Sequence, residues 1–590
     1  MLAVPTLRAV VPTLSEEGQS DLAQIPGVRV RAKRGGGVEV LATADVAQVV
    51  GGEIGLALIG EAARCREVDA GRLGAGLTDY KREAALSLAE GRARLLWWSC
   101  GIGKSATYLA AADLVAPPPG RVLIVTRAMG REVFARDSVL LAKRHRVAVV
   151  VGEGVREFTV PSAAQRAAVR RADRSLQRQR DRGADCVATA SVQDALDQDA
   201  WAVVVSWETL AAHEASILSA RFNVVIFDEH HCGKGRGARR ATAAHRIAAQ
   251  APVVWGGTAT PVPDRVRDLW GQLHSVGGRS AWGTSLKFAK RYAHAVPGRF
   301  GGYDSDGPHR IGCAFCARAT AELKRRLPWW ADMRNRRVIA HLLPTATRAL
   351  IHVPPVGDLS DGEDRSARGG IEGAVSRAAG AKLKSVAARA AEALVAGEKL
   401  CVVGNRRSWV PRMARSIEGA LPAGLRRGGR VWIRQATGEM DVAARLAIAS
   451  EFLSLRTGHA EGEHRAAVLV ATIDSIRTSI DLHDADRVMV AALPWTPEAL
   501  EQLEGRFRRL GQVRPVQYDY FIAEGTIDER IAEALLAKME CIGRAGAEVD
   551  PEGRAWLAGQ QPGEDEVLAG LRAWLSADAD AADRAEAEAV

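Results

Sequence analysis

The chain has 590 residues, enough for three or four domains, and its formal charge of +10 favours a polyanionic partner such as nucleic acid. Hydrophobic residues make up 47% of the chain, which excludes a disordered or fibrous protein. The eight cysteines are mostly isolated in apolar segments, so we expect reduced thiols and no disulfide framework. Since secretory and membrane-spanning patterns are missing, we expect a cytoplasmic protein of a bacterial or phage-infected cell, with no membrane partner.

Strands and helices alternate along two stretches of the chain, from about residue 77 to 270 and from about 385 to 535. This pattern predicts an α/β protein with two parallel-sheet domains. The predicted strands of the first are Arg121–Thr126, Val147–Val151, Ala202–Ser206, Val224–Phe227 and Val253–Gly257. Those of the second are Lys399–Gly404, Arg430–Arg434, Ala467–Thr472, Arg487–Ala491 and Gln517–Ile522.

Composition shifts divide the chain further. The polar, glycine-containing run Gly357–Ser366 is typical of a linker between the two sheets. We therefore predict a small accessory module of unknown role at 1–70, a first ATP-binding domain at 71–275, a helical insertion and linker at 276–384, a second domain at 385–545 and an acidic, alanine-rich tail at 546–590.

A glycine-rich loop lies between a predicted strand, Leu95–Trp98, and a predicted helix, Ala106–Leu114. It reads G-x-G-K-S over Gly101–Ser105, although Trp98 replaces the first glycine of the longer phosphate-loop motif. In such a loop, backbone N–H groups surround phosphates, the lysine reaches the β and γ oxygens and the serine hydroxyl binds Mg²⁺. The order strand, loop, helix therefore predicts a nucleotide site.

An acidic pair, Asp228 and Glu229, follows the apolar run Val224–Phe227. An ordinary turn at the end of a strand is the simpler interpretation. In α/β sheets, however, ligands bind at the carboxyl ends of the strands. There Asp228 can hold Mg²⁺ and Glu229 can polarise a water molecule, so the two motifs together predict hydrolysis of a nucleoside triphosphate.

Two other patterns leave alternatives open. Cys313 and Cys316 have the spacing of zinc ligands, but no second close pair follows, and two cysteines on a packed helix are the favoured interpretation. A basic helix is predicted between Arg166 and Arg182, and a solvated surface helix and a duplex-contacting insertion explain it equally well.

Near the C-terminal end of the second stretch, Arg506 and Arg509 lie three residues apart on a predicted helix and so share a face. Guanidinium groups suit a γ-phosphate whose charge must be stabilised in the transition state. The alternative is a helix whose arginines bind solvent or acidic neighbours.

Residues 77–540 resemble the superfamily 2 helicase-like ATPases, and within them the Swi/Snf-type DNA translocases, closest to the annealing-helicase branch. The segments that carry the resemblance are Leu77–Lys81, Gly101–Ser105, Ser206–Leu210, Asp228–His231 with Lys234, Gly257–Pro261, Asp268–Trp270, Phe288–Tyr292, Arg336–Arg337 with Leu343–Pro344, and Gln502–Gln512. The last, a Q-x-x-x-R-x-x-R-x-G-Q motif, is highly specific. The resemblance implies two tandem RecA-like domains.

The resemblance also implies roles for individual residues. It places adenine against Tyr80 and Lys81, and the phosphates of ATP against Gly101, Ile102, Gly103, Lys104, Ser105 and Ala106. It assigns Mg²⁺ to Ser105 and Asp228, and catalysis to Lys104, Asp228, Glu229, Gln502, Arg506 and Arg509, with Arg509 as the finger. Independently of the resemblance, strand ends and turns, where hydroxyls and backbone amides can meet phosphates, supply the nucleic-acid candidates Thr126, Arg127, Thr437, Gly438 and Thr472, to which motif V adds Arg477.

The chain departs from the family pattern at several positions. Lys81 stands where the family has Gln, and an ammonium group cannot both donate to and accept from adenine, which indicates relaxed base selectivity. Arg477 and Ser479 occupy the aligned glycine positions of motif V, so Arg477 is either a phosphate clamp or a sign of weakened coupling. Asp264 replaces an Asn that follows motif III.

The sequence therefore predicts an ATP-dependent motor that moves on or remodels DNA, duplex or forked, without strong sequence preference. A helicase acting on single-stranded DNA or RNA, and the motor subunit of a defence or restriction complex, are the alternatives. A non-hydrolysing scaffold is disfavoured because Lys104, Asp228, Glu229, Arg506 and Arg509 are all present.

Overall fold

The computed structural model describes residues 6–535 outside a set of gaps. The longest gaps are 47–67, 135–146, 151–185, 306–313, 355–370 and 456–465, and the shorter ones include 100, 260, 262–265, 234–237, 477–481 and 509–511. The described residues form two compact units that divide between residues 338 and 339. No helix in these ranges is long and apolar enough to cross a bilayer.

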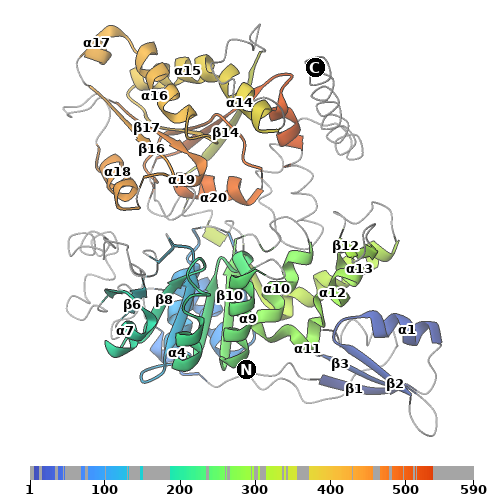
Figure 1. Ribbon diagram of the computed structural model, residues 1–590. Helices are drawn as coiled ribbons and strands as arrows, with labels where there is room; N and C mark the ends of the chain where they lie inside the picture. Colours follow the sequence, from blue (N-terminus) through green and yellow to red (C-terminus); the bar gives the residue numbers. More distant parts are fainter. Residues whose placement is uncertain are drawn as a thin grey trace, which may run out of the picture. The chain divides into compact units, whose positions relative to one another are not determined.

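The first unit is built on a parallel sheet that has eight strands among the described residues (Figure 1). Its order is β13-β4-β10-β9-β5-β8-β6-β7. The strands are β4 (Leu95–Trp98), β5 (Val122–Thr126), β6 (Val147–Val150), β7 (Cys186–Thr189), β8 (Ala202–Ser206), β9 (Val224–Asp228), β10 (Val253–Thr258) and β13 (Ala331–Arg334). Runs such as VLIVT in β5 are buried throughout, as expected for strands covered on both faces.

Helices flank this sheet and complete its core. They are α3 (Asp79–Glu90), α4 (Lys104–Val115), α7 (Val192–Asp197), α8 (Glu214–Ala220), α9 (Arg239–Gln250), α10 (Leu269–Leu273), α11 (Arg279–Trp282), α12 (Ser285–Tyr292) and α13 (Ala314–Arg326). Aromatic residues of the later helices, including Trp282, Phe288 and Tyr292, belong to the same hydrophobic core as the strands. The segment from α11 to β13 is therefore part of the first unit.

A small module precedes the first sheet. It consists of β1 (Thr6–Val11), α1 (Glu16–Gln24), β2 (Val28–Ala32) and β3 (Val38–Thr43), with antiparallel strand order β1-β3-β2. Apolar residues such as Leu22, Val28 and Val40 form its own core. Gly27 has φ +91°, and a Cβ there would lie 2.6 Å from the carbonyl oxygen of Ala281, so the module packs closely against α11.

The second unit contains a six-stranded parallel sheet, counted over the residues described, with order β14-β19-β18-β15-β17-β16. The strands are β14 (Ala346–Val353), β15 (Lys399–Gly404), β16 (Val431–Ala436), β17 (Ala466–Thr472), β18 (Arg487–Val490) and β19 (Val516–Ala523). The helices are α14 (Ile371–Ala381), α15 (Leu383–Val395), α16 (Trp409–Ala420), α17 (Ala423–Arg427), α18 (Val442–Ser454), α19 (Ile473–Ile476) and α20 (Pro497–Phe507).

The two parallel sheets confirm the predicted α/β architecture, and every strand predicted in the two stretches is present. The segment 276–384, predicted as an insertion and linker, is shared between the units, because β13 pairs with β4 and β14 pairs with β19. The predicted basic helix and the acidic tail lie outside the described residues. The domain limits stay a prediction.

Candidate nucleotide site

The glycine-rich loop joins β4 to α4, and two of its residues have left-handed backbone conformations. Gly101 has φ +83° and Gly103 has φ +100°. A Cβ at Gly103 would lie 2.5 Å from Cε of Lys81, the end of a side chain that can move, so it is the left-handed conformation that favours glycine here. Because α4 begins at Lys104, its first N–H groups have no partner within the helix and form a binding site for an anion.

Lys104 folds back onto this loop. Its ammonium group donates hydrogen bonds to the carbonyl oxygens of Trp98, at 2.7 Å, and Ser99, at 3.4 Å. Ile102 is fully buried and fixes the middle of the loop in the core. Lys104 is therefore held at the mouth of the loop, where it can exchange carbonyl oxygens for phosphate oxygens.

The predicted adenine residues lie against the same loop. The Tyr80 hydroxyl donates a hydrogen bond to the carbonyl oxygen of Ile102 at 2.7 Å, and burial raises the pKa of that hydroxyl. The rings of Tyr80 and Trp98 are 5.7 Å apart, and the Lys81 ammonium lies 5.6 Å from the centre of the Tyr80 ring. The structure thus brings Tyr80 and Lys81 together with Gly101–Lys104.

The acidic pair lies at the carboxyl end of β9. Asp228 Oδ2 accepts a hydrogen bond from the Thr126 hydroxyl at 2.8 Å, and the Asp228 carbonyl accepts one from the Trp207 indole at 2.7 Å. Burial raises the pKa of Asp228 to about 6, helped by the charge of Glu229, whereas Lys104 and Thr126 act in the opposite direction. Asp228 is therefore a poorly solvated acid whose charged form needs a cation.

Glu229 has an unusual backbone. Its φ of +48° lies in the left-handed region, which costs a residue with a Cβ on the order of 1–3 kcal/mol. The side chain is 18% exposed and reaches Thr258 Oγ1, at 3.3 Å, and His231 Nδ1, at 3.4 Å. The strain is typical of a residue held for function, and the partial exposure leaves the carboxylate accessible to water.

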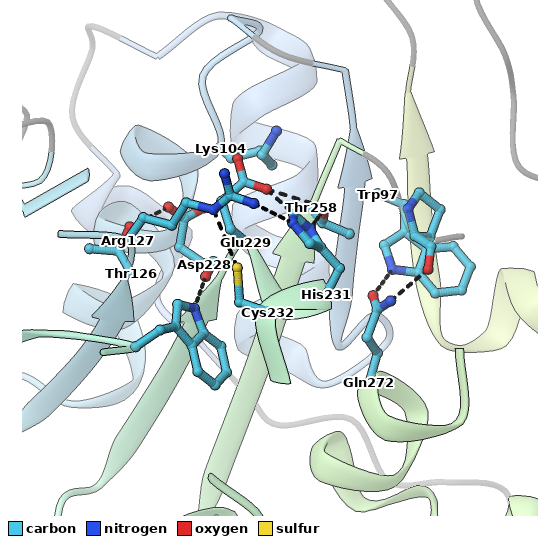
Figure 2. A network of polar contacts seen from close by, with 12 residues as sticks. Trp97, Lys104, Thr126, Arg127, Asp228, Glu229, His231, Cys232, Thr258 and Gln272 are labelled. Atoms are coloured by element: carbon cyan, nitrogen blue, oxygen red, sulfur yellow. Dashed lines mark hydrogen bonds and ion pairs between the residues drawn. The ribbon is translucent and has the colours of Figure 1, made fainter. Parts of the chain in front are cut away.

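His231 connects Glu229 to the end of β5. Its Nδ1 lies 2.7 Å from Thr258 Oγ1, and its Nε2 lies 2.9 Å from Nη2 of Arg127. Figure 2 shows these side chains as one network beside Lys104 and Asp228. Sequence reasoning placed Arg127 at the nucleic acid and assigned no role to His231 or to the Thr258 hydroxyl.

Gln272 of α10 ties two strand ends together. Its Oε1 accepts a hydrogen bond from the Trp97 indole at 3.1 Å, and its Nε2 donates to the carbonyl of Pro261 at 2.7 Å (Figure 2). Trp97 lies on β4 just before the glycine-rich loop, and Pro261 follows β10. The sequence shows only a glutamine within the run Leu269–Leu273, and the burial that makes it a clamp comes from the tertiary structure.

The oxygen atoms at this edge fit Mg²⁺. Ser105 supplies a hydroxyl and Asp228 a carboxylate, and Mg²⁺ is typically bound by one or two such groups together with substrate phosphates. No cluster of three or more His, Cys, Asp or Glu residues suited to a metal occurs among the described residues. A nucleotide-dependent Mg²⁺ site needs no such cluster. Cys313 and the side chain of Cys316 lie outside the described residues.

In the second unit, α20 carries the C-terminal motif. Gln502 is buried and Arg506 lies in the last turn, whereas Arg509 lies beyond the helix and outside the described residues. Arg348 of β14 donates to both carboxylate oxygens of Glu504, at 2.8 and 2.6 Å, and the Tyr520 hydroxyl also donates to Glu504. Glu504 thus anchors the helix, a role that the sequence did not reveal.

The nucleic-acid candidates have different environments. Thr126 and Thr472 lie at the ends of β5 and β17, as predicted, and their side chains are buried, Thr126 fully and Thr472 with 4% exposed. The Thr126 hydroxyl donates its hydrogen bond to Asp228. Thr437 and Gly438 follow β16, with Gly438 exposed, and Arg477 lies outside the described residues.

This chain is similar to one described protein family and to several known proteins. Residues 395–511 match the family described as Helicase conserved C-terminal domain. The SWI/SNF-related matrix-associated actin-dependent regulator of chromatin subfamily A-like protein 1 of Drosophila melanogaster is 23% identical over 59% of this chain and 44% of its own length. The protein of that name from Xenopus tropicalis is 25% identical over 58% of this chain and 35% of its own length. The chain thus spans less than half the length of these relatives.

Among solved structures, the Sulfolobus solfataricus SWI2/SNF2 ATPase core domain aligns with 85% of this chain and 95% of its own, at 14% identity and a TM-score of 0.34. A Mycobacterium smegmatis helicase Lhr bound to ssDNA and AMP-PNP aligns with 81% of this chain and 51% of its own, at 16% identity and a TM-score of 0.42.

Proposed function

We propose that this chain, a superfamily 2 helicase-like ATPase of the Swi/Snf type, is a motor that couples ATP hydrolysis to movement on or remodelling of DNA. One observation carries the proposal. The glycine-rich loop and the acidic pair, far apart in sequence, lie at the carboxyl ends of β4 and β9, two strands separated in the sheet only by β10. The charge of Lys104 acts on Asp228 across this edge. A phosphate-binding lysine beside an under-solvated carboxylate is the arrangement that phosphoryl transfer requires.

In this proposal the loop and the start of α4 bind the phosphates, and Lys104 leaves the carbonyls of Trp98 and Ser99 for the β and γ oxygens. Ser105 and Asp228 hold Mg²⁺, which neutralises charge on the phosphates when bound. Glu229, accessible from solvent, orients and polarises the attacking water. Arg506 and Arg509 supply guanidinium groups that stabilise the charge of the transition state.

The proposal also names the nucleic acid on which the motor acts. The charge of +10 supports a polyanion, and the relatives named above are chromatin regulators by name. We propose duplex or forked DNA bound without strong sequence preference, because contacts to the phosphate backbone carry no base information. The use of Mg²⁺ and the cytoplasmic setting belong to the same proposal.

The test is steady-state ATP hydrolysis by the whole chain without nucleic acid and then with duplex DNA, single-stranded DNA or RNA. Phosphate concentration and salt are held equal, and Lys104→Ala serves as the inactive control. We expect the strongest stimulation by duplex DNA. A preference for single strands or RNA would instead identify a helicase for those polymers, and absence of turnover with every polymer would overturn the proposed ATPase.

A further inference from the structure

Arg127 follows β5, at the position where sequence reasoning expected a nucleic-acid contact, but its guanidinium group bonds within the first unit. Nη2 lies 2.9 Å from His231 Nε2, and Nε donates to the Cys232 sulfur at 3.3 Å. Both partners belong to the turn that follows the acidic pair. The two contacts fix the plane of the guanidinium group against this turn.

The contact with Arg127 determines the protonation of His231. A guanidinium group has only donors, so Nε2 of His231 must accept the hydrogen bond. A histidine whose Nε2 accepts is neutral and carries its proton on Nδ1. This tautomer is assigned from the hydrogen-bond partners of the ring.

The proton on Nδ1 in turn orients Thr258. Nδ1 lies 2.7 Å from Thr258 Oγ1, so it donates to that hydroxyl. The hydroxyl then directs its own proton to Glu229 Oε2, at 3.3 Å. Thr258 is fully buried, so its hydroxyl is shielded from bulk solvent. The donors therefore point in one direction, from Arg127 through His231 and Thr258 to Glu229 (Figure 2).

We infer that Arg127 is a positioning residue that fixes the tautomer of His231 and, through Thr258, the orientation of the Glu229 carboxylate. The chain of donors joins the carboxyl ends of β5, β9 and β10, three strands of one rigid sheet. The hydrogen bond from the Thr258 hydroxyl to Glu229 Oε2 holds the Glu229 side chain and stabilises the strained left-handed backbone at this residue. The inference rests on the proposed ATPase function, in which Glu229 polarises water.

The first experiment compares Arg127→Met with Arg131→Met in the full chain at saturating nucleic acid. Arg131 is a suitable control because its guanidinium group bonds to the backbone carbonyls of Ala128 and Val150, outside the chain of donors. We expect Arg127→Met to lower kcat by about 10- to 100-fold, the range typical of groups that orient a reacting ligand, with KM for ATP nearly unchanged. An equal loss in both variants, or none in Arg127→Met, would overturn the inference.

The second experiment tests the direction of the hydrogen bonds. Gln at position 231 can accept from Arg127 with its oxygen and donate to Thr258 with its nitrogen, whereas Leu can do neither. His231→Gln should therefore retain much more turnover than His231→Leu. The double variant Arg127→Met/His231→Leu should be no slower than the slower single variant, because both remove the same chain. Additive losses would contradict a shared pathway.

A third readout does not depend on activity. In a long-range ¹H–¹⁵N spectrum of the labelled chain, the His231 signals are those missing from His231→Gln, and we expect the neutral tautomer protonated at Nδ1. Protonation at Nε2 would overturn the inference whatever the chain hydrolyses. If Glu229→Gln is inactive but Arg127→Met is not impaired, the inference fails and the ATPase stands. If the wild-type chain does not hydrolyse ATP, the proposed function fails and the spectrum still decides the tautomer.

Discussion

Asp228 in the first unit and Asp519 in the second are acids on parallel strands, and their environments are opposite. Asp228, at the end of β9, has a pKa raised to about 6 by burial and by the charge of Glu229. Burial would also raise the pKa of Asp519, but hydrogen bonds from Arg389, Arg487 and Gln517 lower it. These donors lie 2.8, 2.9 and 2.8 Å from the carboxylate.

The difference separates an acid suited to binding a ligand from acids that stabilise the fold. In the second unit, buried carboxylates such as Asp519 and Glu504 form ion pairs with arginines of the protein, so their negative charge is already neutralised in the folded chain. Asp228 accepts a hydrogen bond from the Thr126 hydroxyl, and the positive charge of Lys104 acts on it. Mg²⁺ bound together with a nucleotide can neutralise the Asp228 carboxylate. In the empty site, the ionised carboxylate lowers the stability of the first unit.

The largest expected effect is on catalysis. Glu229→Gln should lower kcat by about 10²- to 10⁴-fold, because the amide cannot accept the proton of the attacking water. Binding of a fluorescent ATP analogue and the unfolding temperature should change little, since the amide keeps the shape of the side chain. Glu214→Gln is the matched control, because Glu214 pairs with Arg246 away from the site. Normal turnover in Glu229→Gln would remove Glu229 from the mechanism.

The next effect is on the stability of the second unit. Arg348→Met should destabilise it by about 3–5 kcal/mol, because Glu504 would stay buried and charged without its cation. Arg348 and Glu504 are only 7% and 6% exposed. Hydrogen exchange in the full chain should show faster exchange of β14 and α20. Arg389→Met is the control, expected to cost less than about 1 kcal/mol because Arg389 is 39% exposed and Asp519 keeps Arg487. Equal exchange rates in the two variants would contradict the claim that the buried pair Arg348–Glu504 stabilises the second unit more than the pair Arg389–Asp519.

The smallest expected effect has the opposite sign. The pKa of Asp228 is about 6 in the folded chain against an ordinary 3.8, so the folded state binds the proton more tightly than the unfolded state. Stability from this group is therefore full at low pH and is lost as the pH rises from about 4 to 6. Asp228→Asn removes the loss and should stabilise the first unit at pH 8 by on the order of 2 kcal/mol.

This gain should be absent at pH 4, where Asp228 is largely protonated and resembles the amide. Thermal unfolding at both pH values without nucleotide measures the difference. Asp519→Asn should behave in the contrary way and destabilise the second unit at pH 8, since it weakens two ion pairs. If Asp228→Asn destabilises the chain at pH 8, the raised pKa and the contrast between the two acids are both wrong.

Much of the fold follows from local sequence. The central strands are buried on both faces, so they form short apolar runs, and β5, β8, β9, β15 and β17 were all predicted at nearly their observed bounds. β13 was missed because it carries the charged residues Asp332 and Arg334, and β7, which reads CVAT, was missed as well. β14 was missed because its residues are only half buried.

Within the nucleotide site, the sequence by itself determined the groups whose chemistry depends on adjacent residues. The Gly101–Ser105 loop and the pair Asp228 and Glu229 each need only a strand, a turn and the right residue types. Tertiary structure alone decided which distant groups meet. The order of strands in the first sheet brought Thr126 to Asp228 and Arg127 to His231, and the position of α20 beside β14 brought Glu504 to Arg348. Hydrogen bonds and ion pairs act over a few ångströms, so their partners are set by which strands lie side by side, and no local pattern records that order.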